Sequence, residues 1–345
     1  MKRIFVYEYL SGGGAMAGAE GPGDELLTMG QAMRDAIAND LLRLGDYRVS
    51  VATCDLAAPV PGPATPVEPR EGESAFDFVA RQAEAHHLVW VVAPETDGLL
   101  ARLQRGVDPA RWLGCDGPAI ALASGKRATL MRLADAGVTT PLAFAHAPEI
   151  TRWVCKPDDG AGALGTRLHA SPEAAWNDWS QRSRAGSPMA IEPWVDGEAL
   201  SLSLMCSARR TELLSINRQH LAIDGDGMLS YQGVDVNVLP VEHAGGAIAE
   251  RRTGARRAER RAGGPGADRR SDTLGDLATR IGRAIPGLCG YVGIDIVWHA
   301  QRGPVVIEVN PRVTCAYVGL SRALGRNLAG EVIAARDQEA AHGHA

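Results

Sequence analysis

The sequence predicts a mixed α/β and α+β protein, in which a small parallel-sheet domain precedes a larger α+β unit. In the first third, strand patterns at 4–9, 49–53 and 88–92 alternate with helical patterns at 24–44 and 76–85. This alternation is typical of a parallel sheet covered by helices. Further along, helices at 128–136 and 172–184 stand among strand patterns at 153–156, 190–195, 199–206, 212–218, 291–298 and 305–309.

These patterns suggest a domain layout. We expect an N-terminal α/β domain at 1–115 that takes part in substrate binding. A second domain at 116–335 would divide into 116–190, with lysines and a glycine loop, and 191–335, with acidic strands. Residues 336–345 would form a tail.

Composition limits the function classes. The 345 residues are 45% hydrophobic and carry a net charge of −5, which predicts a sizeable core and argues against a nucleic-acid-binding face. Six scattered cysteines without a CxxC pair indicate reduced packing residues of a cytoplasmic protein. No signal-peptide or membrane-spanning pattern occurs, so we expect no membrane partner.

One segment departs from the globular pattern. Eight arginines fall between Arg251 and Arg270, among Gly, Ala and Pro and almost no large apolar residue. Such a stretch cannot bury a core face, so we expect a flexible Arg-rich insertion at 250–271. A basic run can also bind nucleic acid or an acidic partner, but the acidic chain around it favours the solvated interpretation.

Two apolar strands near the C-terminus carry oxygen-bearing side chains. Asp295 stands on one, and Glu308 and Asn310 stand on the other. Because side chains alternate along a strand, Glu308 and Asn310 point to the same side, where Asp295 of a neighbouring antiparallel strand can meet them. Such hard oxygen ligands suit Mg²⁺. Acidic residues are usually exposed on strand ends, but the strongly apolar strands favour a metal site.

A second pattern is a strand that ends in Lys156 and runs into a glycine-rich loop, with Gly160, Gly162 and Gly165. Lysine offers a charge to phosphate oxygens, and glycines allow backbone N–H groups to surround them. The loop is not a Walker A motif. Residues 11–14 do not supply the GxGxxG of an NAD-dependent Rossmann enzyme either.

An acidic hairpin at 191–198 completes the order, and together the three blocks resemble the ATP-grasp family from about Ser124 to Gly330. The family holds ATP between two α+β subdomains. The resemblance implies that Lys126 and Lys156 contact phosphates, beneath a mobile loop that contains Gly160, Gly162 and Gly165. It further implies that Glu192, Trp194 and Val195 form a hinge that binds adenine and that Glu198 contacts ribose. The metal ligands would be Asp295, Glu308 and Asn310. Arg312 would be catalytic, together with Lys156. Taken alone, Lys126 is equally a solvated lysine at a helix start.

The resemblance implies a two-domain ATP-grasp enzyme that uses ATP and Mg²⁺, with Mn²⁺ as an alternative. Phosphoryl transfer would activate a small carboxylate as an acyl phosphate, and an amine would convert it to an amide. Polar residues at 215–220 and 231–233 would contact the substrates, as would the loop at 11–14, through Asn217, Arg218, Gln219, Tyr231, Ser11 and Gly12. A strand with a solvent-facing polar side explains 215–220 equally well. A homodimer is compatible with this scheme.

The whole chain also resembles the tyramine–glutamate ligases of methanofuran and methylofuran biosynthesis, in the segments 5–14 and 310–320. That resemblance implies joining the γ-carboxylate of glutamate to tyramine or tyrosine. Two alternatives stay open: an ATP-grasp ligase for another amino acid or small carboxylate, and a nucleotide-binding module without turnover.

Overall fold

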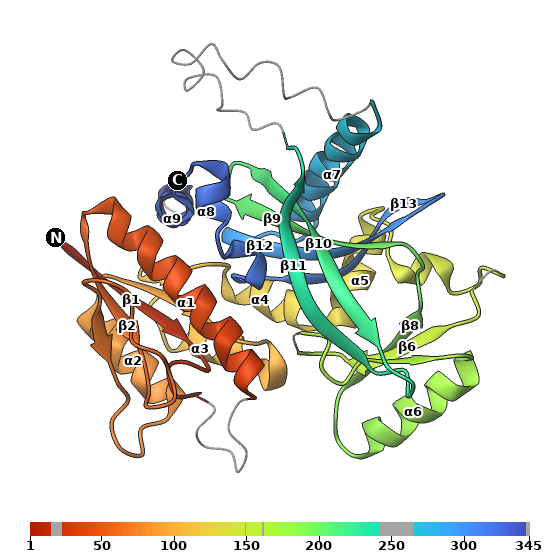
Figure 1. Ribbon diagram of the computed structural model, residues 1–345, viewed down its shortest axis with the longest axis horizontal. Coiled ribbons are helices and arrows are strands. Elements are labelled where there is room, and N and C mark those ends of the chain that lie inside the picture. Colours follow the sequence, from red (N-terminus) through yellow and green to blue (C-terminus); the bar gives the residue numbers. More distant parts are fainter. Residues whose placement is uncertain (15–22, 149, 161, 242–264, 343–345) are drawn as a thin grey trace.

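A parallel sheet forms the N-terminal part of the chain. The computed structural model describes residues 1–14, 23–148, 150–160, 162–241 and 265–342 (Figure 1). The sheet has the strand order β3-β2-β1-β4-β5. Its strands are all paired in parallel and span β1 (Lys2–Glu8), β2 (Tyr47–Ala52), β3 (Thr65–Val67), β4 (Leu88–Val92) and β5 (Trp112–Leu113). The α/β class predicted for this region is therefore confirmed.

Helices cover both faces of this sheet. Ile4 and Val6 belong to the core beneath α1 (Asp24–Leu44), whereas Phe5 and Tyr7 pack edge to face against Phe78 of α2 (Ala75–Ala85). Alternate residues of β1 thus enter different cores because side chains alternate along a strand. This double burial explains why β1 is apolar throughout and not only at every second position. Helix α3 (Leu99–Arg105) follows β4.

Two antiparallel sheets build the rest of the protein. The larger has the order β11-β10-β9-β12-β13, and the smaller has the order β7-β6-β8. In Figure 1 the larger sheet lies between the N-terminal domain and the smaller sheet, which α6 covers. The larger sheet spans β9 (Glu198–Cys206), β10 (Thr211–Ile223), β11 (Leu229–Leu239), β12 (Gly290–His299) and β13 (Gly303–Asn310); the smaller spans β6 (Trp153–Pro157), β7 (Arg167–His169) and β8 (Met189–Pro193); the helices are α4 (Gly117–Ser124), α5 (Lys126–Asp135) and α6 (Pro172–Arg184).

Most predicted elements lie within a few residues of their observed bounds, and α1 has the predicted bounds. The sequence did not predict β11. Its residues are mostly half-buried, and Asn237 adopts a positive φ of 58°, so the strand lacks both an apolar run and a clear alternation. Its partner β10 also extends beyond the predicted end, to Ile223. The extension of β10 beyond residue 218 and the whole of β11 are recognisable only as a pair.

The arginine-rich segment is shorter than predicted. Residues 250–264 of it lie outside the described residues, but α7 (Pro265–Ala284) begins inside the expected insertion. Arg270 on this helix donates to Glu198 at 2.8 Å, and its guanidinium lies 4.6 Å from the Trp298 ring centroid. The last residues of the expected insertion therefore belong to α7, where Arg270 makes these two contacts. Likewise, α9 (Leu328–His342) continues through most of the expected tail.

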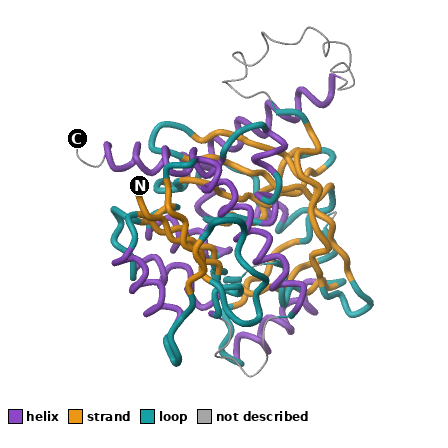
Figure 2. Tube along the Cα trace, turned by 60° about the vertical axis from the view of Figure 1, so that its left-hand side comes forward, coloured by secondary structure: helices purple, strands orange, loops and turns teal. Residues whose placement is uncertain are grey.

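A buried carboxylate joins the two ends of the chain. Asp40 of α1 accepts hydrogen bonds from the Tyr317 hydroxyl at 2.7 Å and from Ser321, and its carbonyl accepts from Asn327 at 2.8 Å. Helix α9 packs along α1, and both views show it on the side of the N-terminal sheet (Figures 1 and 2). The first helix and the last are therefore one packing unit.

Two general features complete the fold. All six cysteines are free, and all except Cys315 are buried. Among the residues that the structure describes, no helix has both the length and the apolar character that crossing a bilayer requires.

We expect Asp40→Ala to lower the free energy of unfolding by about 2–4 kcal/mol, because it leaves two buried hydroxyl groups without their acceptor. Denaturant unfolding followed by circular dichroism measures this. Asp46→Ala, at an exposed position just beyond α1, is the matched control and should change little. Equal stability of the two variants would contradict the role given to Asp40.

Candidate active site

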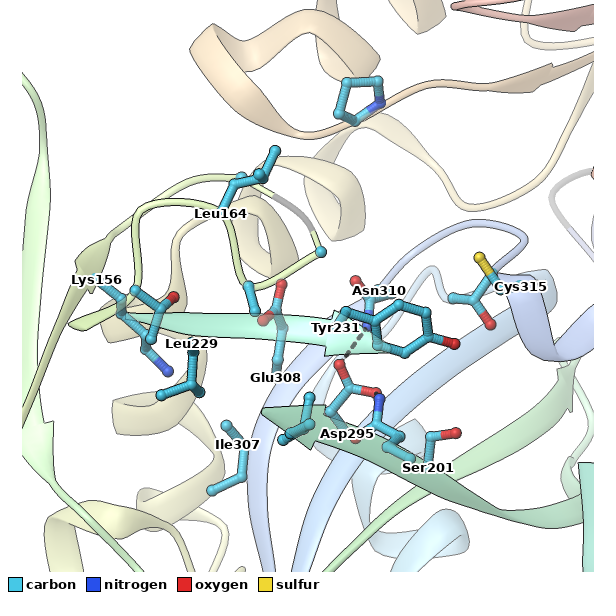
Figure 3. A pocket seen from close by; sticks show the side chains of 18 of the residues that line it. Lys156, Leu164, Ser201, Leu229, Tyr231, Asp295, Ile307, Glu308, Asn310 and Cys315 are labelled. Carbon is cyan, nitrogen blue, oxygen red and sulfur yellow. Dashed lines mark hydrogen bonds between the residues drawn. The ribbon is translucent and has the colours of Figure 1, made fainter. Parts of the chain in front are cut away.

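A cavity of about 430 Å³ lies where the N-terminal domain and the two antiparallel sheets meet. Its walls come from β1, α1, the glycine loop, β6, β8, and the strands β9 to β13. Figure 3 shows Lys156, Glu308, Asn310 and Asp295 around it, with Tyr231 and Cys315 beside the last two. Its size is ordinary for a site that binds small molecules.

The three predicted metal ligands come together as the strand pattern required. β12 and β13 pair antiparallel, with Asp295 opposite Glu308. The Asn310 side-chain amide donates to Asp295 Oδ2 at 3.3 Å, and Gln219 of β10 donates to Asp295 Oδ1 at 3.0 Å. Period-two alternation therefore does bring Glu308 and Asn310 to the same side.

The environment of Asp295 disfavours its charge. Burial, and next the negative charge of Glu308, raise the pKa of Asp295 well above its ordinary value, while the hydrogen bond from Asn310 and the charge of Arg312 act the other way. A nearby cation would relieve this cost.

This donor set fits Mg²⁺ bound together with phosphates. Within the described parts of the chain, no group of three or more His, Cys, Asp or Glu residues could enclose a metal. Two carboxylates and one amide oxygen are fewer ligands than an all-protein cage needs. Mg²⁺ normally keeps several waters and takes one or two carboxylates plus substrate phosphates, so this small set suffices.

Both predicted phosphate lysines line the cavity, and both already contact carboxylates. Lys156 Nζ lies 2.6 Å from Glu192 Oε1, and Lys126 Nζ lies 3.2 Å from Glu308 Oε1. Lys126 also donates to the Gly160 carbonyl at 2.8 Å. Burial lowers the pKa of Lys126, but the charges of Glu308 and other glutamates outweigh it and hold the pKa above its ordinary value. Both lysines are therefore held in place, and phosphates would compete with carboxylates for them.

Arg312 reaches back to the N-terminal domain. Its guanidinium makes two hydrogen bonds of 2.9 Å to the carboxylate of Glu95, which is 2% exposed. Burial lowers the pKa of Arg312, but the charge of Glu95 and its hydrogen bonds raise this pKa by more, so the pKa lies above its ordinary value. A bidentate pair of this kind also fixes the plane of the guanidinium.

The glycine loop lies against the N-terminal domain. The Asp97 N–H donates to Asp159 Oδ2 at 2.7 Å. Gly160 and Gly162 line the cavity with φ values of 125° and 70°, a region that favours glycine, whereas Gly165 lies outside the lining. Two of the three predicted glycines thus face the cavity.

The predicted adenine hinge borders the cavity, but its donors are partly engaged. Glu192, Trp194 and Val195 line it. The backbone N–H of Trp194 donates to the Arg152 carbonyl at 2.9 Å, so this N–H is not free to bind a base. Glu198, predicted to contact ribose, begins β9 but is not in the lining, because it pairs with Arg218 and Arg270.

The predicted substrate residues divide into two groups. Gln219 and Tyr231 line the cavity. Arg218 is outside, paired with Glu198 at 2.9 Å. Asn217 is fully buried and spends its hydrogen bonds on neighbouring strands, with its amide nitrogen 3.1 Å from Ser203 Oγ. The two residues predicted from the N-terminal loop, Ser11 and Gly12, do not line the cavity.

Sequence reasoning missed Glu8 and Ser201, which line the cavity, and Glu95, which pairs with the lining residue Arg312. Glu8 ends β1, and Glu95 follows β4 by three residues. In open α/β sheets, ligands bind outside the carboxyl ends of the strands, so the position of these two glutamates was a usable signal. Ser201 carries no such signal, because its side chain is placed by its pairing opposite Asp295.

The fold and this constellation agree with the family comparison. Residues 123–316, more than half of the chain, match the family profile described as an ATP-grasp domain, and residues 47–120 match a pre ATP-grasp 3 domain. The chain therefore belongs to the ATP-grasp family.

Two relatives are more specific. The chain is 29% identical over 232 residues to the tyramine–L-glutamate ligase of Methanocaldococcus jannaschii, an alignment that covers 67% of this chain and 57% of the relative. It is 28% identical over 231 residues to the corresponding ligase of Methanocaldococcus fervens, covering 66% and 60%. The chain thus spans less than two thirds of the length of these curated relatives.

Solved structures share the fold. An ATP-grasp superfamily protein of Archaeoglobus fulgidus is similar with a TM-score of 0.63 and 20% identity, over 97% of this chain and 88% of that one. A D-alanine–D-alanine ligase of Bacillus anthracis in complex with ATP is similar with a TM-score of 0.60 and 13% identity, over 97% of each chain. At these identities the likeness concerns the fold alone.

The raised pKa of Asp295 predicts how stability depends on pH. Folded protein keeps the Asp295 carboxyl group protonated at a pH where the unfolded chain, whose carboxyl pKa is about 4, has lost the proton. The contribution is therefore present in full below that value and is lost as pH rises through the raised pKa. In metal-free buffer we expect the midpoint of thermal unfolding to fall as the buffer approaches neutral pH. Asp295→Asn should flatten this trend, and an unchanged slope would contradict it.

Proposed function

We propose that this protein is an ATP- and Mg²⁺-dependent carboxylate–amine ligase. The observation that carries the proposal is one cavity that combines the Asp295, Glu308 and Asn310 cluster with two buried lysines and Arg312. Such a set of cations and metal ligands suits phosphoryl transfer, which depends mostly on positioning and charge neutralisation. Family membership and the names of the two relatives support the same class of reaction.

Each residue has a role in this proposal. Lys126 and Lys156 bind phosphate oxygens after exchanging their carboxylate partners, and Arg312, oriented by Glu95, steadies the transferred phosphoryl group. Asp295, Glu308 and Asn310 hold Mg²⁺, which when bound neutralises phosphate charge. Apolar residues of the cavity would receive the adenine ring: Val154, Val195, Leu229 and Ile307.

The reaction proceeds in two steps. A carboxylate oxygen of the first substrate attacks the γ-phosphorus of ATP, so that an acyl phosphate forms and ADP leaves. The second substrate, an amine that has lost its ammonium proton, attacks the acyl carbon. Phosphate leaves, the nitrogen loses a second proton, and an amide remains. The glycine loop, which already contacts Asp97, would exclude water from the acyl phosphate.

For the substrates, we propose glutamate as the carboxylate, activated at its γ-carboxyl group, and tyramine or tyrosine as the amine. The names of the relatives support this choice, as does a cavity in which apolar side chains surround a polar end. The product would belong to the biosynthesis of a methanofuran or methylofuran type of cofactor.

Phosphate release from Mg-ATP tests the proposal. Purified protein is incubated with glutamate and with tyramine, tyrosine or other amines in turn, and products are identified by mass. A γ-glutamyl amide of tyramine or tyrosine is the expected result. Release with another substrate pair would retain the ligase but reject these substrates, and no release with any pair would favour a nucleotide-binding module without turnover.

We expect Glu308→Gln to lower kcat/KM by about a hundredfold or more, a size typical of losing one preorganised electrostatic contact in a transition state. Glu308 also contacts Lys126, so the activity loss alone does not identify a metal ligand. The Mg²⁺ concentration for half-maximal rate should therefore be measured as well, and it should rise. Glu71→Gln, at an exposed position, is the control. An unchanged Mg²⁺ requirement would reject the metal assignment.

A further inference from the structure

Glu8 is a deeply buried carboxylate in the wall that the N-terminal domain contributes to the cavity. It ends β1, is 3% exposed, and accepts hydrogen bonds from the backbone N–H groups of Leu10 at 3.1 Å and Ser11 at 2.8 Å. None of the ion pairs found among the described residues includes Glu8. Burial raises its pKa, against which those two hydrogen bonds and the more distant charge of Arg34 act. A buried carboxylate without a cation in contact is costly, so it calls for an explanation.

The fold makes room for this carboxylate at the expense of helix stability. A Cβ atom added to Gly30, in the interior of α1, would lie 2.6 Å from Glu8 Oε2 and 2.7 Å from Oε1. Glycine inside a helix is less stable than alanine, and nothing in the backbone of α1 requires it, because Gly30 has no positive φ. The close approach of Glu8 accounts for a glycine at this position.

The surroundings of Glu8 on this wall are apolar. Leu10 lines the cavity, as do three residues of α1 that lie within one helical turn of Gly30, namely Leu26, Met29 and Met33. The cations in the lining are Lys126, Lys156 and Arg312, and each already has a carboxylate partner. The sequence of 15–22, between the β1 loop and α1, contains no Lys, Arg or His. A ligand at Glu8 therefore meets one negative charge within an apolar surface.

Glu8 also lies within electrostatic reach of the reacting end of the cavity. Burial raises the pKa of the Cys315 thiol, the charge of Arg312 lowers it, and the charges of Asp295 and Glu8 add to the rise. The charges of Asp295 and Glu8 therefore both act on Cys315. Figure 3 shows Cys315 close to Asn310. Because Glu8, Cys315 and the metal-ligand cluster line one cavity, a molecule held at Glu8 shares that cavity with an acyl group formed at the cluster.

We propose that Glu8 binds the ammonium group of the acceptor amine, and that the apolar wall around it selects amines with no carboxylate beside the nitrogen. This inference rests on the ligase function proposed above and extends it to one residue and one substrate class. An α-amino acid would bring its carboxylate next to Glu8, where like charges repel and the cations of the cavity lining already have carboxylate partners. The wall thus favours a decarboxylated, apolar amine such as tyramine over tyrosine, and it disfavours the α-amino end of the donor glutamate.

Trapping with hydroxylamine separates this inference from the proposed function. Hydroxylamine is small and largely uncharged at neutral pH, so it converts the acyl phosphate to a hydroxamate without an ammonium site. Wild type should form the hydroxamate from glutamate and Mg-ATP, and should use tyramine with a higher kcat/KM than tyrosine. Glu8→Gln should retain hydroxamate formation and the KM for glutamate, but raise the KM for tyramine about ten- to a hundredfold, the size of a lost charged hydrogen bond.

Two further variants complete the design. Gly30→Ala keeps the charge of Glu8 but displaces the carboxylate, so it should also raise the KM for tyramine with hydroxamate formation retained. Glu84→Gln, at an exposed position on α2, should behave as wild type. The thermal unfolding midpoint of each variant shows whether it is folded.

The outcomes are distinct. An unchanged KM for tyramine in Glu8→Gln, with hydroxamate still formed, would overturn the role of Glu8 alone. A raised KM for glutamate in the hydroxamate assay would place the donor ammonium at Glu8 and overturn the assignment to the acceptor. A wild-type preference for tyrosine would overturn the proposed selectivity. Absence of any hydroxamate from wild type would overturn the ligase function, and this inference with it.

Discussion

The antiparallel pairing of β12 with β13 holds two carboxylates, Asp295 and Glu308, opposite each other in the interior of the protein. Their mutual repulsion must be compensated, and the surrounding structure does so. Lys126 approaches Glu308, while amide groups of Gln219 and Asn310 donate to Asp295. Burial, and next the charge of Glu308, still raise the pKa of Asp295. A cation bound there would add to the compensation, so the same strain that weakens the metal-free protein favours metal binding.

The need to pair buried charge also links the domains. Arg312 follows β13 but pairs with Glu95 of the N-terminal domain, and Asp159 of the glycine loop accepts from the Asp97 backbone. Lys156 meets Glu192 within the smaller sheet. In the proposed function, phosphates of the nucleotide would replace the carboxylate partners of Lys126 and Lys156.

The cavity has two chemically different ends. One carries the metal-ligand cluster and the cations, and the other carries Glu8 within the apolar wall of the N-terminal domain. This division suits a reaction in which a charged nucleotide and an apolar amine approach one acyl group from different sides. Under the role proposed for Glu8, the parallel-sheet domain would take part in substrate selection, which the strand order alone does not indicate.

Much of this protein could be predicted from its sequence. Period-two alternation determined that Glu308 and Asn310 share a face, and apolar runs with turn residues located α1 and most of the strands, because these patterns depend on neighbours along the chain. Only the tertiary structure decided what long-range pairing controls. Asn217 is turned inward among serines, and Arg218 and Glu198 neutralise each other away from the cavity. A separate domain supplies Glu8 to the cavity and Glu95 to Arg312. Sequence specifies which groups can carry charge, but whether a charge meets a partner or a ligand depends on which distant segments fold against it.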